Sequence, residues 1–213
     1  MWYPPPSLAM QPRQSPARTF PDFLRPAFQP TALERVDSTV AVLDAQAAIL
    51  WTNPAWDDFA RANGASFNLD AYPTYLDGIA GPLRAFYADV FEQALARGTV
   101  FEQDYECSAA DVIRRYRMRV LPYPAHGLLV EHTPIAVSPA PDGGELAVEA
   151  HFLDENGHIV QCSNCRRVKR PGASDSESWA WVPAWVTRSH PRTSHGICTP
   201  CVGFYWRRGR SRR

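Results

Sequence analysis

Four of the chain's five cysteines form two CxxC pairs whose spacing predicts a metal site. The pairs are Cys162–Cys165 and Cys198–Cys201, with 32 residues between them. Each CxxC turn offers two thiolates to one ion, and two turns complete the tetrahedral four-sulfur shell of structural zinc sites. We therefore expect Cys162, Cys165, Cys198 and Cys201 to hold a structural Zn²⁺. Disulfides or four unrelated cysteines are the alternative. Because protein ligands fill the shell, we expect no catalytic residues and no enzyme activity.

Other chemistries fit these residues less well. His195 precedes Cys198 by three residues and could replace a cysteine, but with four cysteines present we expect it to support a thiolate or the backbone instead. Ser194 and His195 have no acidic partner nearby, which argues against a hydrolase triad. A zinc deaminase needs His-x-Glu with Pro-Cys-x-x-Cys, and redox chemistry needs one isolated CxxC pair. Neither pattern occurs.

Charge is divided unevenly along a chain whose net charge is zero. Residues 31–160 carry 8 basic and 19 acidic side chains, whereas residues 161–213 carry 11 basic and 2 acidic ones. The basic segment offsets the negative charge of a zinc–thiolate centre, or it contacts nucleic acid phosphates. In the second case Trp179, Trp181 and Trp185 would be stacking surfaces, although their spacing also suits the core of a small module.

The length and composition indicate one or two small domains, and the lack of a recognisable export signal leads us to expect a cytoplasmic protein. The 213 residues are 45% hydrophobic and 12% aromatic, which is enough for a real core. No apolar run approaches the length of about 18 residues that a membrane span needs, so we expect no membrane partner. The N-terminal text lacks the order of a secretory signal. A reducing compartment favours zinc over disulfides at CxxC pairs.

The elements that position the cysteines follow from periodicity. Residues 1–31 contain eight prolines and are expected to be a disordered leader, in which Phe20, Phe23, Leu24 and Phe28 could form a short docking segment. Alternating residues then predict a hairpin, two helices and three more strands. These elements should lie at 39–44 and 49–51, at 54–63 and 82–97, and at 100–107, 112–122 and 127–133.

This order predicts the α+β class: an antiparallel sheet with helices on one face, followed by a small four-cysteine module. We expect the sheet domain at 32–136, a Pro/Gly-rich linker at 137–150, the zinc-binding module at 151–206 and a basic tail at 207–213.

The element order and local text resemble the PAS sensory domain. The matching stretches cover about half of the chain and are 42–44, 49–56, 75–77, 101–107, 115–120 and 130–133. The C-terminal text resembles a zinc-ribbon-like segment appended to PAS domains in some bacterial signalling proteins, at 162–167, 181–183 and 194–201. One departure is Pro134-Ile135-Ala136, where many PAS domains have the Asp-Ile-Thr that connects sensor to effector.

The resemblance implies a non-catalytic signalling protein. Its PAS-like domain would sense a small ligand or a partner, and its structural zinc module would be presented to a signalling protein. The alternative is a zinc-dependent, nucleic-acid-binding transcriptional regulator in which PAS is the dimerisation unit. The sensed ligand and its binding residues are unknown at this stage.

Several side chains of the predicted sheet domain could line a cavity or hold a cofactor. The helix at 82–97 has no histidine, which weakens a haem interpretation. Cys107 is expected to be a buried structural thiol, and His126 and His132 to be structural or solvated. A ligand cavity could be lined by aromatic residues, most of which we expect to be plain core: Trp51, Trp56, Phe59, Tyr72, Tyr75, Phe86, Phe91, Tyr105 and Tyr116.

Overall fold

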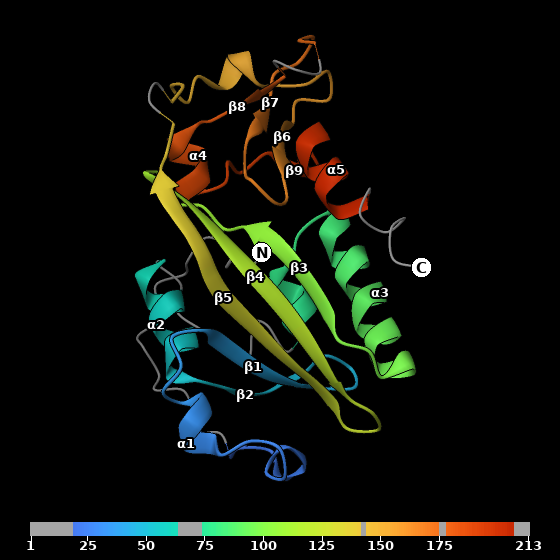
Figure 1. The fold of residues 1–213 in the computed structure, drawn as a ribbon. Coiled ribbons are helices and arrows are strands. Elements are labelled where there is room, and N and C mark those ends of the chain that lie inside the picture. Colours follow the sequence, from blue (N-terminus) through green and yellow to red (C-terminus); the bar gives the residue numbers. More distant parts are fainter. Residues whose placement is uncertain (1–18, 64–73, 142–143, 175–177, 207–213) are drawn as a thin grey trace.

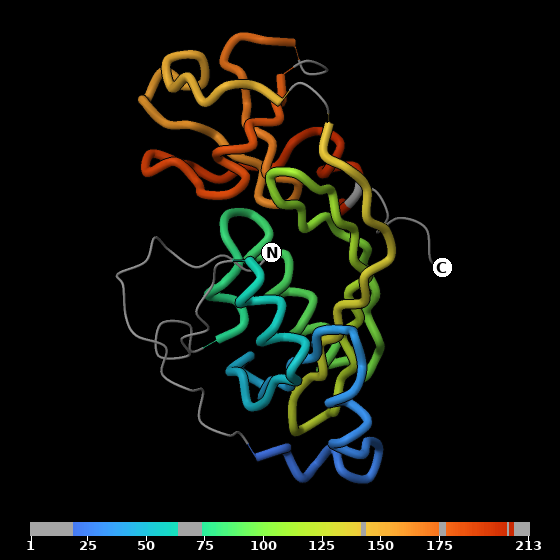
Figure 2. Tube along the Cα trace, turned by 90° about the vertical axis from the view of Figure 1, so that its left-hand side faces the viewer, coloured from blue at the N-terminus to red at the C-terminus, as the bar shows by residue number. Residues whose placement is uncertain are grey.

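The computed structural model describes residues 19–63, 74–141, 144–174 and 178–206. It has two parts, a sheet domain and a C-terminal module that contains the four paired cysteines (Figure 1). Seen from the side in Figure 2, the module lies on one end of the sheet domain. The chain is therefore of the α+β class, as the sequence predicts.

The sheet domain is built on a five-stranded antiparallel sheet with the order β2-β1-β5-β4-β3. The strands are β1 (Thr39–Asp44), β2 (Ile49–Thr52), β3 (Phe101–Glu106), β4 (Val112–Tyr123) and β5 (Gly127–Pro139). All five lie where the alternating pattern predicts them. Gly127 opens β5 with φ +156°, and a Cβ there would lie 1.9 Å from the backbone oxygen of Leu43, so only glycine fits where β5 meets β1.

Helices α2 (Pro54–Ala62), η2 (Tyr75–Gly78) and α3 (Pro82–Arg97) pack on one face of this sheet. The Asn53 side chain caps α2 by accepting a hydrogen bond from the Trp56 amide at 3.1 Å. Gly98 ends α3 with φ +64°, the left-handed conformation typical of a glycine after a helix. Among the described residues, no helix is both long and apolar enough to cross a bilayer.

The opposite face of the sheet is also covered, which differs from the expectation for residues 1–31. Residues 19–33 form η1 (Asp22–Leu24) and α1 (Pro30–Leu33), and Leu24 is fully buried. Leu24 belongs to an apolar cluster with Phe20, Leu33, Val40, Val42, Trp51 and Leu129. Residues 19–33, the described part of the expected leader, thus pack on the second face of the sheet. They are needed there because β1 has apolar side chains on both of its faces, and both faces must be kept from water. Residues 1–18 lie outside the described residues.

The expected linker at 137–150 also differs. β5 continues through Pro139, three residues into the expected linker. Further on, the Glu145 amide donates a hydrogen bond to the Trp181 carbonyl at 2.8 Å, so this part of the connection packs on the C-terminal module. Pro134-Ile135-Ala136, which stands where many PAS domains have Asp-Ile-Thr, lies inside β5 in the part that pairs with β4. β5 thus carries the chain through these three residues as far as Pro139, and the connection contacts the module at Glu145.

The C-terminal module has a four-stranded sheet with the order β8-β7-β6-β9. Its core includes Phe152, Ile159, Val168, Val182 and Trp185. The elements are η3 (Glu149–His151), β6 (Ile159–Cys162), β7 (Val168–Lys169), β8 (Trp179–Ala180), α4 (Pro183–Thr187), β9 (Thr193–Gly196) and α5 (Thr199–Trp206).

Candidate metal centre and aromatic cavity

A parallel strand pair brings the two CxxC turns together. β6 and β9 run side by side with Cys162 opposite Gly196, so Cys198 follows two residues after the end of that pairing. Cys165 lies on the turn after β6, whose Arg166 has φ +63°, and Cys201 lies in the first turn of α5. The structure thus places the four predicted cysteines in one cluster.

The geometry of this cluster suits one metal ion. The four sulfur atoms lie within 4.8 Å of one another, and the Cys165 and Cys198 sulfurs are 3.6 Å apart. Two sulfurs at about 2.3 Å from one ion in a tetrahedron would be about 3.8 Å apart, whereas a disulfide measures about 2.05 Å. All four are free thiols and all are buried. Residues of this type at this distance fit a tetrahedral four-sulfur site of the kind that zinc or iron prefers.

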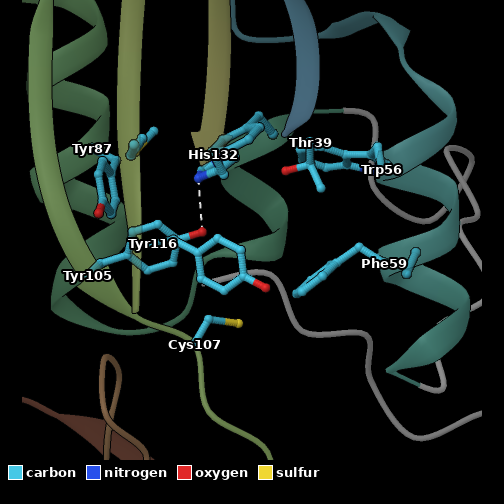
Figure 3. Close-up of a pocket in the computed structure, with 11 residues that line it drawn as sticks. Thr39, Trp56, Phe59, Tyr87, Tyr105, Cys107, Tyr116 and His132 are labelled. Carbon is cyan, nitrogen blue, oxygen red and sulfur yellow. Dashed lines mark hydrogen bonds between the residues drawn. The ribbon is translucent and has the colours of Figure 1, made fainter. Parts of the chain in front are cut away.

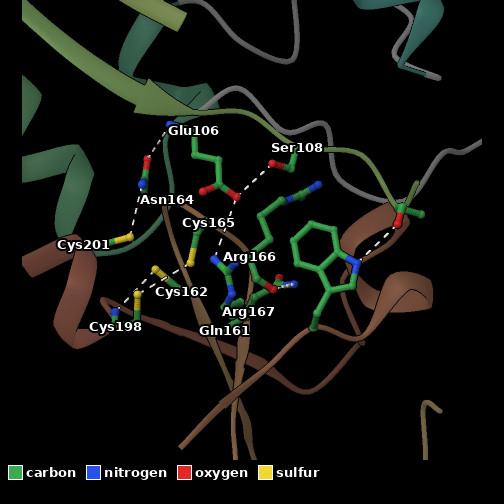
Figure 4. A network of polar contacts seen from close by, with 12 residues as sticks. Glu106, Ser108, Gln161, Cys162, Asn164, Cys165, Arg166, Arg167, Cys198 and Cys201 are labelled. Atoms are coloured by element: carbon green, nitrogen blue, oxygen red, sulfur yellow. Dashed lines mark hydrogen bonds and ion pairs between the residues drawn. The ribbon is translucent and has the colours of Figure 1, made fainter. Parts of the chain in front are cut away.

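Hydrogen-bond donors face two of the four sulfurs, and the pKa values of the four thiols shift in opposite directions. The Cys198 amide points at the Cys162 sulfur at 3.4 Å, and the Asn164 side-chain amide donates to the Cys201 sulfur at 3.2 Å (Figure 4). The pKa of Cys162 is lowered, first because the Cys165 thiol hydrogen-bonds its thiolate. The pKa of Cys201 is raised, first because of its hydrogen bond with Cys162. Protons retained in this way must leave when a metal binds, which makes metal affinity dependent on pH.

The neighbouring basic residues have specific partners inside the protein. Arg166 is buried and donates to the Val186 carbonyl, and burial lowers its pKa to about 9. Arg167 lies over the Trp181 ring at 5.6 Å and 3.9 Å from the Glu106 carboxylate. Burial lowers the pKa of Arg167, but the Cys165 thiolate and Glu106 outweigh it, and the net shift is upward. Arg167 therefore offsets negative charge at the cysteine cluster, as one of the two sequence interpretations requires.

Arg170 is also engaged, in an ion pair with Glu145. Lys169 is exposed on β7, and residues 207–213 lie outside the described residues. His195 is on β9, and within the described part of the chain it makes no hydrogen bond to a cysteine sulfur. The contact of His195 with a thiolate is therefore not seen, and the other half of the expectation, support of the backbone, stays a prediction.

The three tryptophans named above as stacking surfaces serve the packing of the module, which also contains Trp206, 44% exposed at the end of α5. Trp185 is 7% exposed and belongs to the module core, and Trp181 is 6% exposed with its indole N–H donated to the Ala110 carbonyl at 3.3 Å. Trp179 is half-buried against the cysteine cluster. Side chains buried in this way do not offer the open faces that stacked bases need.

A second candidate site is an aromatic cavity in the sheet domain, between the sheet and α2 (Figure 3). The volume open to the centres of water molecules is about 40 Å³, which is room for about three waters. Its lining residues are Thr39, Trp56, Phe59, Ala60, Tyr75, Tyr87, Tyr105, Cys107, Tyr116, Met118 and His132. None of these is an acidic or strongly basic side chain.

His132 lies in the wall of this cavity between two tyrosines. Its Nε2 is 2.8 Å from the Tyr75 hydroxyl, and its Nδ1 is 2.9 Å from the Tyr105 hydroxyl. Burial lowers the pKa of His132 to about 3, so the imidazole is neutral at pH 7. Burial likewise raises the pKa of Tyr75 and of Tyr105 well above 10, which keeps both hydroxyls protonated.

Counting hydrogens shows what this triad still offers. A neutral imidazole carries one N–H, and each tyrosine carries one O–H, which makes three donors for two hydrogen bonds. One tyrosine hydroxyl hydrogen is therefore left to donate elsewhere. The Tyr116 hydroxyl points toward Phe59 and Cys107 in Figure 3. The cavity thus presents hydroxyl donors in an otherwise apolar, aromatic wall.

Sequence reasoning anticipated part of this wall. Trp56, Phe59, Tyr75, Tyr105 and Tyr116 line the cavity as considered, whereas Trp51 lies in the apolar cluster on the opposite face of the sheet. Phe86 and Phe91 are core residues, and Tyr72 lies outside the described residues.

The structural interpretation of His132 and Cys107 missed their place in the cavity wall. One signal was available for His132, because it continues the alternation of Leu128 and Val130 on the face toward the helices. His126 stacks on Phe23 at 5.1 Å, away from the cavity, which fits its expected structural role.

Comparison with known proteins gives structural neighbours alone. No protein-family model matches the chain, and no curated protein matches it significantly. The PAS domain of a Colwellia psychrerythraea protein is 13% identical with a TM-score of 0.37, over 49% of this chain and 92% of that one. The PAS domain of nitrogen regulation protein NR(II) from Vibrio parahaemolyticus is 18% identical with a TM-score of 0.32, over 51% and 100%.

A third neighbour is the Vibrio cholerae VqmA dimer, a LuxR-type receptor described with regard to DNA binding. It is 10% identical with a TM-score of 0.36, over 58% of this chain and 64% of that one. At these levels of similarity, what these proteins sense or bind is not transferred to this chain. The structural neighbours are thus PAS domains at low identity, and the α+β class rests on the strand order and the helix layer described above.

Proposed function

We propose that this chain is a non-catalytic signalling protein that senses a small uncharged ligand in its sheet domain and holds a structural Zn²⁺ in its C-terminal module. The observation that carries the proposal is the aromatic cavity around the neutral His132. A wall of this kind binds a ligand by contact and by a few directed hydrogen bonds, which is how small-molecule sites are usually built.

The wall also limits the chemistry of the ligand. Among the described residues, no acidic or strongly basic side chain lines the cavity, and an unpaired anion would lose its hydration there without compensation. The hydroxyl of Tyr116 and one hydroxyl of the Tyr75–His132–Tyr105 triad favour a hydrogen-bond acceptor on the ligand. Flat aromatic side chains such as Trp56 and Phe59 favour a planar apolar body. We therefore propose a small, uncharged, planar molecule with an acceptor atom.

Zinc is the proposed metal because the donor set consists of four thiols and no other group. Such a shell stabilises a short segment outright and leaves no coordination position for a substrate. The cytoplasmic location expected from the sequence would keep the thiols reduced. The zinc would then serve structure, and the signal would leave the protein through a contact made by the module.

A protein partner is the better-supported recipient of the signal. The nucleic-acid alternative needs exposed aromatic and cationic side chains, but Trp181 and Trp185 are buried, and Arg166, Arg167 and Arg170 have partners within the chain. Dimerisation through the PAS-like domain remains part of the proposal. A gel-shift titration at low salt tests the alternative directly, because phosphate contacts are strongest there.

The experiment for the main proposal has two independent readouts on protein purified under reducing conditions. Elemental analysis should give one zinc per chain. Native mass spectrometry after incubation with a mixture of small uncharged heteroaromatic compounds should show a bound molecule in the wild type and in Ala62→Phe, but not in Ala60→Phe. Ala60 lines the cavity on α2, whereas Ala62 is exposed on the same helix.

The two halves of the proposal fail separately. Protein without zinc would refute the metal assignment. A wild type that retains no compound from the mixture, or an Ala60→Phe protein that retains the same compound as the wild type, would refute ligand sensing in this cavity.

A further inference from the structure

Among the contacts of the cysteine cluster with the sheet domain is a buried polar side chain, Asn164, which lies between the cysteines of the first pair. Asn164 is 4% exposed. Its amide nitrogen donates to the Cys201 sulfur at 3.2 Å, and its amide oxygen accepts from the Glu106 backbone N–H at 3.4 Å (Figure 4). The same oxygen accepts from the Tyr205 hydroxyl at 2.9 Å. One side chain thus joins a candidate metal ligand, the end of β3 and helix α5.

Tyr205 carries the contact into the core of the sheet domain. It is 4% exposed and belongs to the same apolar cluster as the residues of α3 and the sheet. Its ring packs edge-on against Phe86 with centroids 5.2 Å apart, and its hydroxyl is 3.4 Å from the Tyr87 hydroxyl. Helix α5, which begins at the second cysteine pair, therefore inserts a side chain between module and sensor domain.

Tyr87 completes the path, because it also lines the aromatic cavity. A continuous series of polar contacts runs from Cys201 through Asn164 and Tyr205 to Tyr87. The two parts approach closely beside it. A Cβ on Gly81, the residue before α3, would lie 2.6 Å from both the His195 Cβ and the Ser163 hydroxyl oxygen.

Metal coordination would act on the first member of this series. Backbone hydrogen bonds hold the ends of the turn, from the Cys162 amide to the Arg167 carbonyl and from the Ser163 amide to the Gly196 carbonyl, both at 2.8 Å. Bound metal would add two strong bonds through Cys162 and Cys165, whereas unbound thiols add only weak hydrogen bonds. A turn that moves takes the Asn164 amide with it, and Tyr205 and the Glu106 amide then lose a buried partner. Such losses are costly inside a protein, so the docking of α5 should follow the state of the turn.

We propose that metal occupancy at the four cysteines controls the Tyr87 wall of the aromatic cavity through Asn164 and Tyr205. The proposal rests on the metal and cavity sites proposed above and adds their linkage. By reciprocity, a ligand that prefers the closed wall would tighten metal binding by the same factor by which metal tightens ligand binding. The sensor would then read a ligand and the metal supply together. The usual size of such a linkage is about 5- to 150-fold.

Hydrogen exchange of the full chain tests this linkage without a known ligand. Amide exchange is measured by mass spectrometry with Zn²⁺ and after removal of Zn²⁺ with a chelator, for the wild type, Tyr205→Phe, Asn164→Ala and the control Tyr123→Phe. The control variant Tyr123→Phe also removes one tyrosine hydroxyl, but at the β4–β5 hairpin. There the Tyr123 ring packs against Phe23 and Phe28 and not against the module.

In the wild type, removal of Zn²⁺ should speed exchange at least 5-fold in the first half of α3, which contains no metal ligand. Tyr123→Phe should respond in the same way. In Tyr205→Phe and Asn164→Ala the response of α3 to Zn²⁺ should fall below about 2-fold, while the amides next to the cysteines still respond.

The linkage is overturned if wild-type α3 exchanges equally with and without Zn²⁺ while the cysteine turns respond. It is overturned as well if both Tyr205→Phe and Asn164→Ala keep the wild-type response. A chain that takes up no Zn²⁺ in the same titration refutes the metal assignment itself, which is a different result. The wild-type comparison requires no variant to fold.

Discussion

Acid should destabilise the folded protein through His132, because burial makes this imidazole harder to protonate in the fold than in the unfolded chain. The pKa of this imidazole is about 3 in the fold and about 6.5 in an unfolded chain. Between these values the unfolded state binds one more proton than the folded state, so stability falls as the pH falls. From pH 6.5 to pH 4.5, His132 alone should remove about 2 kcal/mol from the free energy of unfolding, because the limiting slope of about 1.4 kcal/mol per pH unit is reached only below pH 6.

The measurement is the difference between the wild type and His132→Gln. Glutamine does not titrate, and its amide can still bond both Tyr75 and Tyr105. Urea unfolding, followed by tryptophan fluorescence at constant Zn²⁺ from pH 7 to pH 4.5, gives the free energy of each protein. Groups that both proteins share, including the cysteines with their metal and Glu106, whose pKa burial raises, cancel in the difference.

The wild type should lose about 2.5 kcal/mol more than His132→Gln between pH 7 and pH 4.5. His158→Gln, which removes an exposed imidazole, should keep the wild-type pH dependence. Parallel curves for the wild type and His132→Gln would refute the reasoning, because they would mean that His132 accepts a proton in the fold as easily as in the unfolded chain.

Three further perturbations test other parts of the structure. Cys162→Ser should abolish stoichiometric zinc and loosen the C-terminal module, seen as lost metal in elemental analysis and lost near-UV circular dichroism, whereas Cys107→Ser should retain its metal. Leu24→Ala should cost about 2–5 kcal/mol in urea unfolding because it empties a fully buried site, and a cost below about 0.5 kcal/mol, the level expected of a surface change such as Val36→Ala, would mean that residues 19–33 do not cover the sheet. Gly127→Ala should prevent the pairing of β1 with β5, since its Cβ would overlap the Leu43 carbonyl, and a soluble variant with wild-type amide exchange in β1 would contradict this contact.

The sheet domain was predictable because its signals are local. Alternation along 112–122 and the Asn53-Pro54 start of α2 each depend on a few adjacent residues, and the structure places both elements accordingly. The cover on the second face was not predictable in the same way. Leu24 and its neighbours have no regular period, and only the burial of Val40 and Val42 opposite them reveals their role.

The cysteine cluster was likewise predictable as a set, since a CxxC turn constrains its two sulfurs locally and only the distance between the two turns is long-range. How the cluster lies on the sheet domain was not predictable. Asn164 and Tyr205 are 41 residues apart, and Tyr87 is 118 residues from Tyr205. No spacing rule relates such residues. The sequence therefore predicted where a metal could bind but not which part of the sheet domain lies next to it.

The neutrality of His132 also determines which ligands the cavity rejects. A cavity can accept an anion if a neighbouring histidine takes up a proton to pair with it. With a pKa of about 3, protonation of His132 at pH 7 costs about 5 kcal/mol, a factor of about 10,000 in affinity, before the ligand has lost any hydration. Selection against anions therefore follows from the depth at which the Tyr75–His132–Tyr105 triad is buried.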